Sequence, residues 1–485
     1  MKVFKFGGAS VRDAAAVRNL YNVLENHPGG PKLVVVSAMG KTTNALELVI
    51  ADYLFHKNPD LPQPGLNRPA IWKEYMDSAS PQTLDLLDQP SLPGKWHWNP
   101  TQASEGVEEN HKMSEVLAEE GPSDYRKSLG IVKAFHLGLV KNLFKEPDGP
   151  VSNKLITLFE KLENFLEHNK SLQYDFVYDQ VISFGELLSS IIVSQYLLEQ
   201  GMQNKWLDAR SLIKTDSTYR DAEIQWDETC DKILEAVVLE DLFITQGFIG
   251  SDSNNFSTTL GREGSDYSAG IFAYCLDAES VTIWKDVPGI LNADPRVFDR
   301  HELLHQISYE EAIELAFYGA SVIHPKTLQP LQRKSIPLYV RSFIHPENEG
   351  TAVSKGQPIV PEVPCFIVKK NEVLISLSSL DFSFIVEENI SEIFALLHKY
   401  QMKVDLIQNS AISFSVCVEN KFHTLDKLIN HLKARFKVQY LTGVSLYTIR
   451  HFDARAVEQI ERDNEVLLKQ ETRATVQLVT LPKPS

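Results

Sequence analysis

Cysteine is scarce in this chain. The sequence has 4 cysteines among 485 residues, and no two are spaced as a Cys-x-x-Cys metal or redox pair. So few cysteines in so long a chain are typical of a reducing cytosol, and we expect each to be a small buried hydrophobic residue. The four positions are Cys230, Cys275, Cys365 and Cys417.

Long apolar segments are also missing. The N-terminus reads Met-Lys-Val-Phe-Lys-Phe-Gly-Gly, which has no signal-peptide h-region. Apolar runs further on, such as 33–36 and 191–193, are far shorter than a membrane span. We therefore expect a cytoplasmic protein with no membrane partner.

An excess of positive charge is the third absence. Lys and Arg total 48 against 64 Asp and Glu, a net charge of −16. This balance argues against nucleic acid or an anionic membrane as the main partner. Apolar residues make up 43% of the chain, which excludes disorder as its main state. The length suggests two to four domains.

The order of elements in the first part of the chain predicts an α/β fold with a doubly wound, mostly parallel sheet. Predicted strands over 2–6 and 32–39 are each followed by a helical pattern, over 11–24 and 43–55. Further strands are predicted near 176–182, 242–250, 280–284 and 337–341. Further helices are predicted near 129–145, 151–168, 186–199 and 309–318.

Two stretches interrupt this pattern. Residues 56–128 are rich in polar residues and proline, and we interpret them as an irregular insertion that packs through its tryptophans, Trp72, Trp96 and Trp98. Residues 346–364 gather prolines and glycines, and we interpret them as a linker. The expected domains are therefore 1–345 and 365–485.

Beyond the linker the pattern reads βαββαβ and then βαβ. Strands are predicted near 371–378, 403–408, 411–418, 443–450 and 474–480, and helices near 390–400, 423–434 and 453–469. Two α+β units are expected, the second short of a helix.

The first motif that could carry chemistry is Lys5-Phe6-Gly7-Gly8-Ala9-Ser10. A lysine ends a strand, and two glycines lead into a helix. Glycines allow backbone N–H groups to approach an anion, and the lysine adds a charge suited to phosphate. An ordinary strand–turn–helix with a surface lysine explains these residues equally well.

A second motif, Gly40-Lys41-Thr42-Thr43, is similar to a P-loop in its position between a strand and a helix. A P-loop needs a glycine five positions earlier, where this chain has Val35. We therefore reject a P-loop here.

A third segment, 258–269, combines hydroxyls, glycines and charged residues ahead of an apolar helix. Arg262 is suited to hold a carboxylate through two hydrogen bonds. Ser265 or Asp266 could equally be only the cap of the helix.

Two more segments place polar residues at predicted element ends. The loop 284–296 follows a strand, where parallel sheets bind ligands, although a solvated turn is an alternative. Glu186 opens an apolar helix, where a glutamate usually compensates the helix dipole.

Taken in order, these segments resemble the aspartate kinase family, whose members have the amino acid kinase fold. The match spans nearly all of 1–350 apart from the insertion, and seven motifs in register make it specific. The segments are KFGGASV at 5–11, VVVSAMGKTTNAL at 34–46, SFGELLS at 183–189, DARSLIKTD at 208–216, GFIGSDSNNFSTTLGREGSDYSA at 247–269, IWKDVPGILNADPR at 283–296 and SYEEAIELAFYGASVIHPKTLQP at 308–330.

The resemblance implies transfer of the ATP γ-phosphoryl group to the side-chain carboxylate of L-aspartate, the first step toward lysine, threonine and methionine. Such a transfer needs mainly positioning and charge neutralisation. Mg²⁺ is implied with ATP, bound through phosphate oxygens and water, with no dedicated protein ligand. No dinucleotide-binding unit follows before Ser485, so a monofunctional enzyme is expected.

The family pattern also implies residue roles at the phosphate. Lys5 would neutralise the moving phosphoryl group, and Asp266 would hold Lys5. Backbone amides around Gly7, Gly8 and Ser10 would cradle the phosphate. The further nucleotide positions are Lys285, Asp286, Leu291, Arg296 and Ser321.

For the amino-acid substrate, the pattern implies a second set of residues. Glu186 would receive the ammonium group, and Arg262 would clamp the α-carboxylate with Ser265 nearby. Thr43 would contact the substrate.

Several positions depart from the family pattern. Glu263 replaces a glycine and adds negative charge near anionic substrates, and Ser321 replaces a lysine and loses a nucleotide contact. The other departures in this region are Ala9 for threonine and Leu291 for tyrosine. Because the main site residues are kept, we expect activity, with ATP affinity affected more than chemistry.

The C-terminal region resembles the paired ACT domains of aspartate kinases. The segment VDLIQNSAIS at 404–413 resembles one that helps bind the feedback amino acid, with Ala411 in place of a glutamate. Such units pair across subunits, which implies a homodimer. An amino-acid effector is implied as well, although a dimerisation module without a ligand is the alternative.

Two alternative functions stay open at this point. A kinase for another carboxylate or a carbamate is one, and the Glu186 and Arg262 pair argues against it. A catalytically silent amino-acid sensor is the other, and the retained Lys5 and Asp266 argue against it. We also expect the insertion to lie at the active-site rim, because it falls between Thr43 and Glu186.

Overall fold

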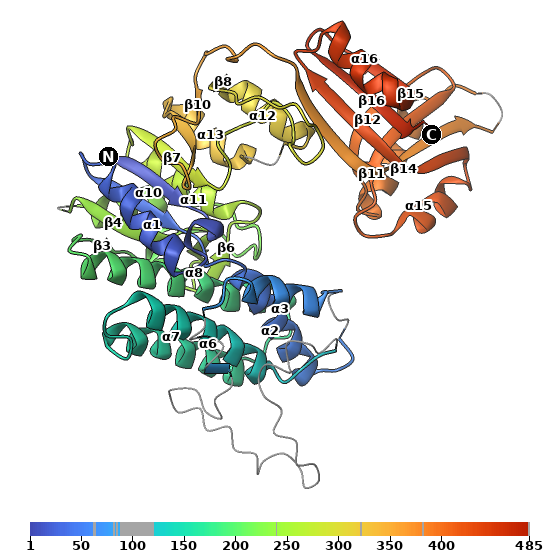
Figure 1. Cartoon of the computed structure of the whole chain (residues 1–485). Helices are drawn as coiled ribbons and strands as arrows, with labels where there is room; N and C mark the ends of the chain where they lie inside the picture. Colours follow the sequence, from blue (N-terminus) through green and yellow to red (C-terminus); the bar gives the residue numbers. More distant parts are fainter. Residues whose placement is uncertain are drawn as a thin grey trace. The chain divides into compact units, whose positions relative to one another are not determined.

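The chain forms two compact units, one of residues 1–289 and 323–355 and one of 290–322 and 356–485 (Figure 1). The computed structural model describes residues 1–61, 65–80, 83, 86, 87, 121–238, 240–320, 323–380 and 383–483.

A mostly parallel sheet organises the first unit, as the sequence predicted. Neighbouring strands follow the order β3-β4-β2-β1-β7-β9-β10, and only β9 and β10 pair antiparallel among these. The strands are β1 (Lys2–Phe6), β2 (Lys32–Val36), β3 (Lys205–Trp206), β4 (Leu242–Gln246), β7 (Ser280–Lys285), β9 (Leu338–Ser342) and β10 (Thr351–Ser354). A separate antiparallel pair consists of β5 (Ile249–Ser251) and β6 (Ser257–Thr259).

The helices of the first unit pack on both faces of this sheet and on one another. They are η1 (Gly8–Val11), α1 (Ala14–Glu25), α2 (Thr42–Lys57), α3 (Arg68–Met76), α6 (Tyr125–Leu143), α7 (Pro150–His168), α8 (Tyr174–Glu199), α9 (Ala209–Leu212), α10 (Trp226–Ala236), α11 (Gly264–Cys275) and α13 (Pro325–Lys334). Phe4 and Phe6 of β1 pack into the core with α1, α2 and α8, and α7 lies beyond α8 (Figure 1). Because side chains alternate along a strand, Lys5 points to the opposite face, toward α11.

The predicted strand over 176–182 is wrong, because these residues belong to the 26-residue helix α8. A buried strand and a buried helix give similar apolar runs, and Val177 and Val181 also fit a helical spacing. The predicted strand over 242–250 is two strands, β4 and β5. They are separated at Phe248, whose φ is 69°.

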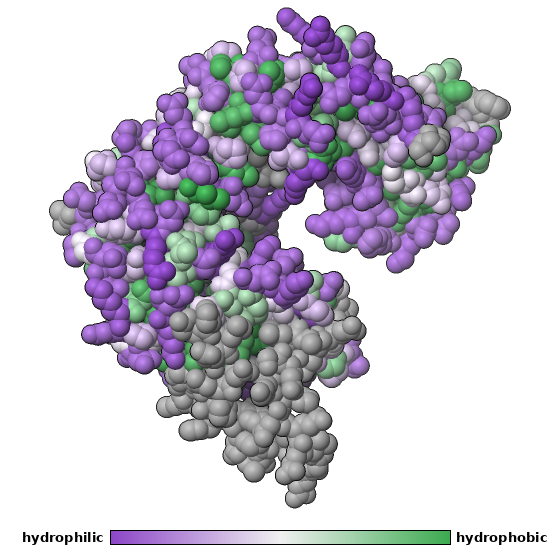
Figure 2. Space-filling view, viewed as in Figure 1, coloured by the Kyte–Doolittle hydropathy of each residue, from purple (hydrophilic) through white to green (hydrophobic). Residues whose placement is uncertain are grey.

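Helix α8 is a core element. By length and composition alone it could span a membrane, but 78% of its apolar window is buried inside the protein. The molecular face in Figure 2 is mostly hydrophilic, with apolar residues in scattered groups.

The described part of the 56–128 insertion packs against α2. Arg68 of α3 donates to both carboxylate oxygens of the fully buried Asp52, at 2.7 and 3.0 Å. Trp72 is fully buried, as a packing role requires, whereas Trp96 and Trp98 lie outside the described residues.

The second unit is α+β and ACT-like, as the sequence predicted. Its antiparallel sheet has the order β12-β13-β11-β14-β16-β15. The strands are β11 (Cys365–Ser379), β12 (Lys403–Asn409), β13 (Ser413–Glu419), β14 (Phe436–Arg450), β15 (Asn464–Glu471) and β16 (Thr475–Pro482). The helices α14 (Glu387–Lys399) and α15 (Leu425–Leu432) share one core with the first half of the sheet, and α16 (Ala454–Asp463) packs on the second half.

The second unit also contains 290–322, which the expected boundaries assigned to the first domain. This segment holds β8 (Gln306–Ser308) and α12 (Tyr309–Tyr318). Phe298 packs in the core beside α16, and Arg450 donates to both carboxylate oxygens of Glu311, each at 2.8 Å. Composition near 346 gives no sign of these long-range contacts.

The predicted helix over 453–469 is wrong in its second part. Helix α16 ends at Asp463, and residues 464–471 form β15. The apolar spacing changes there from helical, at Val457 and Ile460, to alternating, at Val466 and Leu468.

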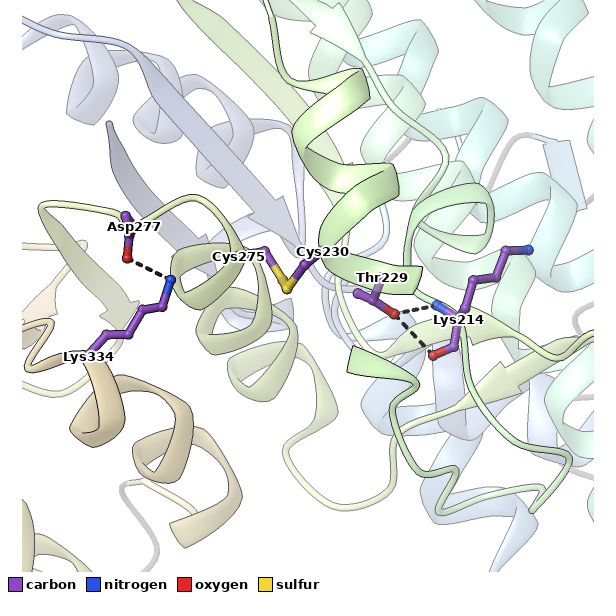
Figure 3. Close-up of a disulfide and its surroundings, with 6 residues drawn as sticks. All are labelled: Lys214, Thr229, Cys230, Cys275, Asp277 and Lys334. Atoms are coloured by element: carbon purple, nitrogen blue, oxygen red, sulfur yellow. Dashed lines mark hydrogen bonds and ion pairs between the residues drawn. A yellow bond between two sulfur atoms is a disulfide. The ribbon is translucent and has the colours of Figure 1, made fainter. Parts of the chain in front are cut away.

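A disulfide joins Cys230 of α10 to Cys275 at the end of α11 (Figure 3). The expectation that all four cysteines are simple buried hydrophobic residues is therefore wrong for this pair. The two cysteines are 45 residues apart in the sequence, so no local spacing pattern indicated that they form a bond. Cys365 and Cys417 are buried and free, and burial raises the pKa of each thiol to about 12.

We expect two titratable thiols, not four, when the unreduced protein is denatured and treated with a thiol reagent. Reduction should raise the count to four and lower the Tm, because closing a loop of this length stabilises a fold by roughly 4 kcal/mol. Cys275→Ser should expose one new thiol without a reductant. A count of four in the unreduced protein would show that the bond is not formed in solution.

Candidate active site

A cavity of about 330 Å³ opens at the carboxyl ends of the central strands, a size typical of small-ligand sites. Lys5 lies near the end of β1, Lys285 ends β7, and Ala38 follows β2. The lining residues are Lys5, Gly8, Ser37, Ala38, Gly40, Thr43, Glu186, Phe248, Gly261, Glu263, Gly264, Ser265, Asp266 and Lys285. Seven of these were predicted as site residues, and the structure brings them together from five separate stretches of chain.

One end of the cavity is a buried charge cluster. The Nζ atom of Lys5 lies 2.6 Å from Oδ1 of Asp266, and Nζ of Lys285 lies 3.3 Å from Oδ2 of the same carboxylate. Burial alone would raise the pKa of Asp266, but the two ammonium groups outweigh burial and hold that pKa below its usual value. Asp266 therefore stays ionised and positions both lysines at the cavity wall.

Glu186 supplies a second charged group. It lies in the middle of α8, so the interpretation as a dipole-compensating first-turn residue is wrong. Its Oε1 accepts a hydrogen bond from the Ala38 N–H at 3.3 Å, while its buried Oε2 has no hydrogen-bond partner within the described chain. Burial raises the pKa of Glu186 to about 8, against the lowering effects of that hydrogen bond and the Lys5 charge. A buried, unsatisfied carboxylate oxygen at a cavity wall is suited to a ligand ammonium.

The turn after β1 requires glycine at position 8. A Cβ on Gly8 would lie 2.9 Å from the carbonyl oxygens of Ala38 and Gly40, so only glycine fits there. A Cβ on Gly7 would lie 3.3 Å from Nζ of Lys5. Ser10 is buried, and its hydroxyl donates to the Trp284 carbonyl at 3.2 Å, so this side chain serves the fold and not the cavity.

Of the other three residues predicted to bind the amino-acid substrate, two line the cavity and one does not. Thr43 and Ser265 line the cavity. Arg262 belongs to the loop between the lining residues Gly261 and Glu263, but its own side chain is exposed. Any contact of Arg262 with a ligand carboxylate therefore requires that side chain to turn inward.

The other nucleotide positions that the structure describes are not among the lining residues. Asp286 is exposed, directly after Lys285. Leu291 and Arg296 belong to the second unit, where Nη2 of Arg296 lies 2.7 Å from Oδ2 of Asp294. Ser321 lies outside the described residues.

Sequence reasoning did not single out several lining residues, among them Ser37, Ala38 and Phe248. Ser37 and Ala38 follow β2 directly, which is the position where a parallel sheet binds ligands. The predicted strand over 32–39 is too long by three residues, and that error placed both residues inside the strand.

Helix α8 also fixes the strand that leads into the charge cluster. Asp179 accepts hydrogen bonds from the Thr259 N–H at 2.8 Å and the Thr259 hydroxyl at 2.7 Å. Gln180 exchanges two hydrogen bonds with the backbone of Ser257. The helix that carries Glu186 thus holds β6 in place. A short loop after β6 leads to α11, which carries Asp266.

The described insertion residues lie beside Gly40, one of the residues that line the cavity. Nζ of Lys41 lies 3.3 Å from Oε2 of Glu74, and a Cβ on Gly40 would lie 3.5 Å from the Ser78 hydroxyl. These contacts support the prediction that the insertion abuts the active site.

The fold and cavity define an α/β protein with a cavity suited to a small anionic ligand that also carries an ammonium group. Residues 1–342 match the family model of the amino acid kinase family, and the chain belongs to that family.

Individual relatives agree with the resemblance to aspartate kinases. The chain is 34% identical over 283 residues to lysine-sensitive aspartokinase 3 of Escherichia coli (strain K12), covering 56% of this chain and 62% of that protein. It is 32% identical over 288 residues to the aspartokinase of Chlamydia pneumoniae, covering 58% and 63%. The matches thus span less than two thirds of these relatives.

Solved structures share the fold over nearly the whole chain. E. coli aspartokinase III in complex with lysine and aspartate superimposes with a TM-score of 0.72 at 24% identity, covering 99% of this chain and 96% of that one. The same enzyme with aspartate and ADP gives a TM-score of 0.70.

Proposed function

We propose that this protein is an aspartate kinase, which transfers the γ-phosphoryl group of ATP to the side-chain carboxylate of L-aspartate. The observation that carries the proposal is the pairing, in one cavity, of buried Glu186 with the Lys5–Asp266–Lys285 cluster. One end suits an amino acid's ammonium group and the other suits phosphate. E. coli aspartokinase III, which shares this fold, has been solved with aspartate and ADP, and that complex supports this substrate pair.

The chain's own residues supply positioning and charge. Lys5 and Lys285 stabilise the negative charge on the moving phosphoryl group, and Asp266 keeps both ammonium groups in place. Glu186 orients aspartate by its ammonium group, and Arg262 turns inward to hold the α-carboxylate.

Mg²⁺ accompanies ATP in this proposal. It is held by phosphate oxygens and water, which suits its reluctance to lose hydration. The chemistry it supplies is neutralisation of phosphate charge, and no side chain is assigned to it.

The proposal also covers the regulation of the enzyme and its assembly into a dimer. The ACT-like unit binds an amino-acid effector and pairs two subunits, and the lysine-sensitive relative supports this class of effector. The enzyme works in the cytoplasm at the first step toward lysine, threonine and methionine. The Cys230–Cys275 disulfide is unusual for that compartment, and thiol trapping in fresh cell extract tests the assignment.

An acyl-phosphate assay tests the activity. The protein is incubated with MgATP, hydroxylamine and, in turn, aspartate, glutamate or N-acetylglutamate. Hydroxamate formed with aspartate alone is the expected result, and a preference for another carboxylate would contradict the substrate. Folded protein that binds an amino acid but forms no hydroxamate would instead favour the sensor.

A further inference from the structure

Glu263 has a backbone conformation that is unusual for a charged residue. It precedes α11 directly, and its backbone is left-handed, with φ 53° and ψ 29°. This region favours glycine, because a Cβ is crowded there. A side chain kept in such a conformation at a cavity wall suggests a function for that side chain.

The Glu263 carboxylate lies at the lysine end of the cavity. It is one of the lining residues, and its buried Oε2 has no hydrogen-bond partner among the residues that the structure describes. Burial raises the pKa of Glu263, Asp266 raises it further, and Lys285, Arg262 and Lys5 lower it. Glu186, on α8, lines the same cavity.

The net charge at the lysine end of the cavity depends on whether Glu263 is ionised. Lys5 and Lys285 contribute two positive charges, and Asp266 cancels one of them. An ionised Glu263 cancels the other, so these four side chains together have no net charge to offer a phosphate, while Arg262 is exposed. A protonated Glu263 leaves one net positive charge.

We propose that Glu263 sets the affinity of the site for the triphosphate, weakening binding as a carboxylate and permitting it as a carboxylic acid. This inference rests on the proposed function, since it takes ATP as the anion. ATP binding is then linked to proton uptake at Glu263, and affinity falls as pH rises.

Calorimetric titration of the full chain with MgATP, without aspartate, tests the proposal. The wild type, Glu263→Gln and Glu263→Gly are compared at about pH 6 and about pH 8.5, because burial raises the pKa of Glu263 from its usual value. Both variants should bind MgATP at least about tenfold more tightly than the wild type at the higher pH. Glu186 and the phosphates titrate in all three proteins, so only the Glu263 contribution differs.

Two controls separate charge from backbone effects. Ser335→Gly changes another left-handed residue, at φ 55°, on the exposed end of α13. It should raise the Tm, as Glu263→Gly should, but leave MgATP affinity unchanged. Glu263→Gln removes the charge and keeps the backbone.

Equal affinities and equal pH dependence in the three proteins would overturn the proposal, as would weaker binding by the variants or no binding by any protein. The proposed function fails separately, through the hydroxamate assay. Tighter MgATP binding by Glu263→Gln without any hydroxamate would leave the Glu263 role standing and remove the kinase activity.

Discussion

Replacing Lys5 with alanine lowers kcat by about a thousandfold or more, because the proposed phosphoryl transfer loses one of the two ammonium groups that neutralise its charge. The buried Asp266 also loses the closer of its two partners, while Lys285 still contacts it. Steady-state kinetics of aspartyl hydroxamate formation measures the effect. Lys5→Arg should keep the charge but restore little activity, since a planar guanidinium presents its donors differently.

Lys2 provides the matched control on the same strand. Its ammonium pairs with Glu279 at 3.6 Å, and its side chain is partly exposed at the other end of β1. Lys2→Ala should keep wild-type kinetics, and circular dichroism should show all three variants folded. A Lys5→Ala protein that phosphorylates aspartate at the wild-type rate would refute the assignment of the site.

Replacing Glu186 with glutamine lowers aspartate affinity by about a hundredfold, because a charge-assisted hydrogen bond to the ammonium is lost. MgATP affinity should stay unchanged. The Tm should change little at neutral pH, since burial already keeps most of the Glu186 carboxyl group neutral there, as a glutamine is.

The raised pKa of Glu186 gives this prediction a second readout. In the ligand-free protein the pKa is about 8, so the carboxyl group is mostly protonated at neutral pH. Binding an ammonium requires the ionised form, so aspartate binding should release nearly one proton at about pH 7 and tighten as pH rises to about 8. Calorimetry in buffers of different ionisation enthalpy counts the proton.

Glu199, at the exposed end of the same helix, is the matched control. Glu199→Gln should keep both the affinity and the proton release of the wild type. If Glu186→Gln still releases the proton and binds aspartate normally, the ammonium site lies elsewhere.

The local part of the site was predictable from sequence. Lys5, Gly7 and Gly8 form one strand–turn segment, in which a residue's neighbours in the chain are also its neighbours in space. Asp266 was placed near a helix start by its local pattern, but its role came only from the family resemblance, and the helix cap is Glu263. The parallel sheet also follows from local order, because strand–helix alternation leaves few topologies.

What sequence reasoning missed depends on distant contacts. Helix α8 was divided into a strand and a helix, since an apolar run buried on all sides has no clear period. That error placed Glu186 at a helix start and hid its burial in mid-helix. The disulfide and the packing of 290–322 with the second unit likewise join residues far apart in sequence.

The most direct test of the central claim identifies the phosphorylated carboxylate. The protein is incubated with MgATP and L-aspartate, the acyl phosphate is reduced with borohydride, and the product is identified by mass spectrometry and chromatography. Transfer to the side-chain carboxylate predicts homoserine, absent without ATP and absent with Lys5→Ala. The isomeric 3-amino-4-hydroxybutanoate, from transfer to the α-carboxylate, or no reduced product at all, would contradict the account.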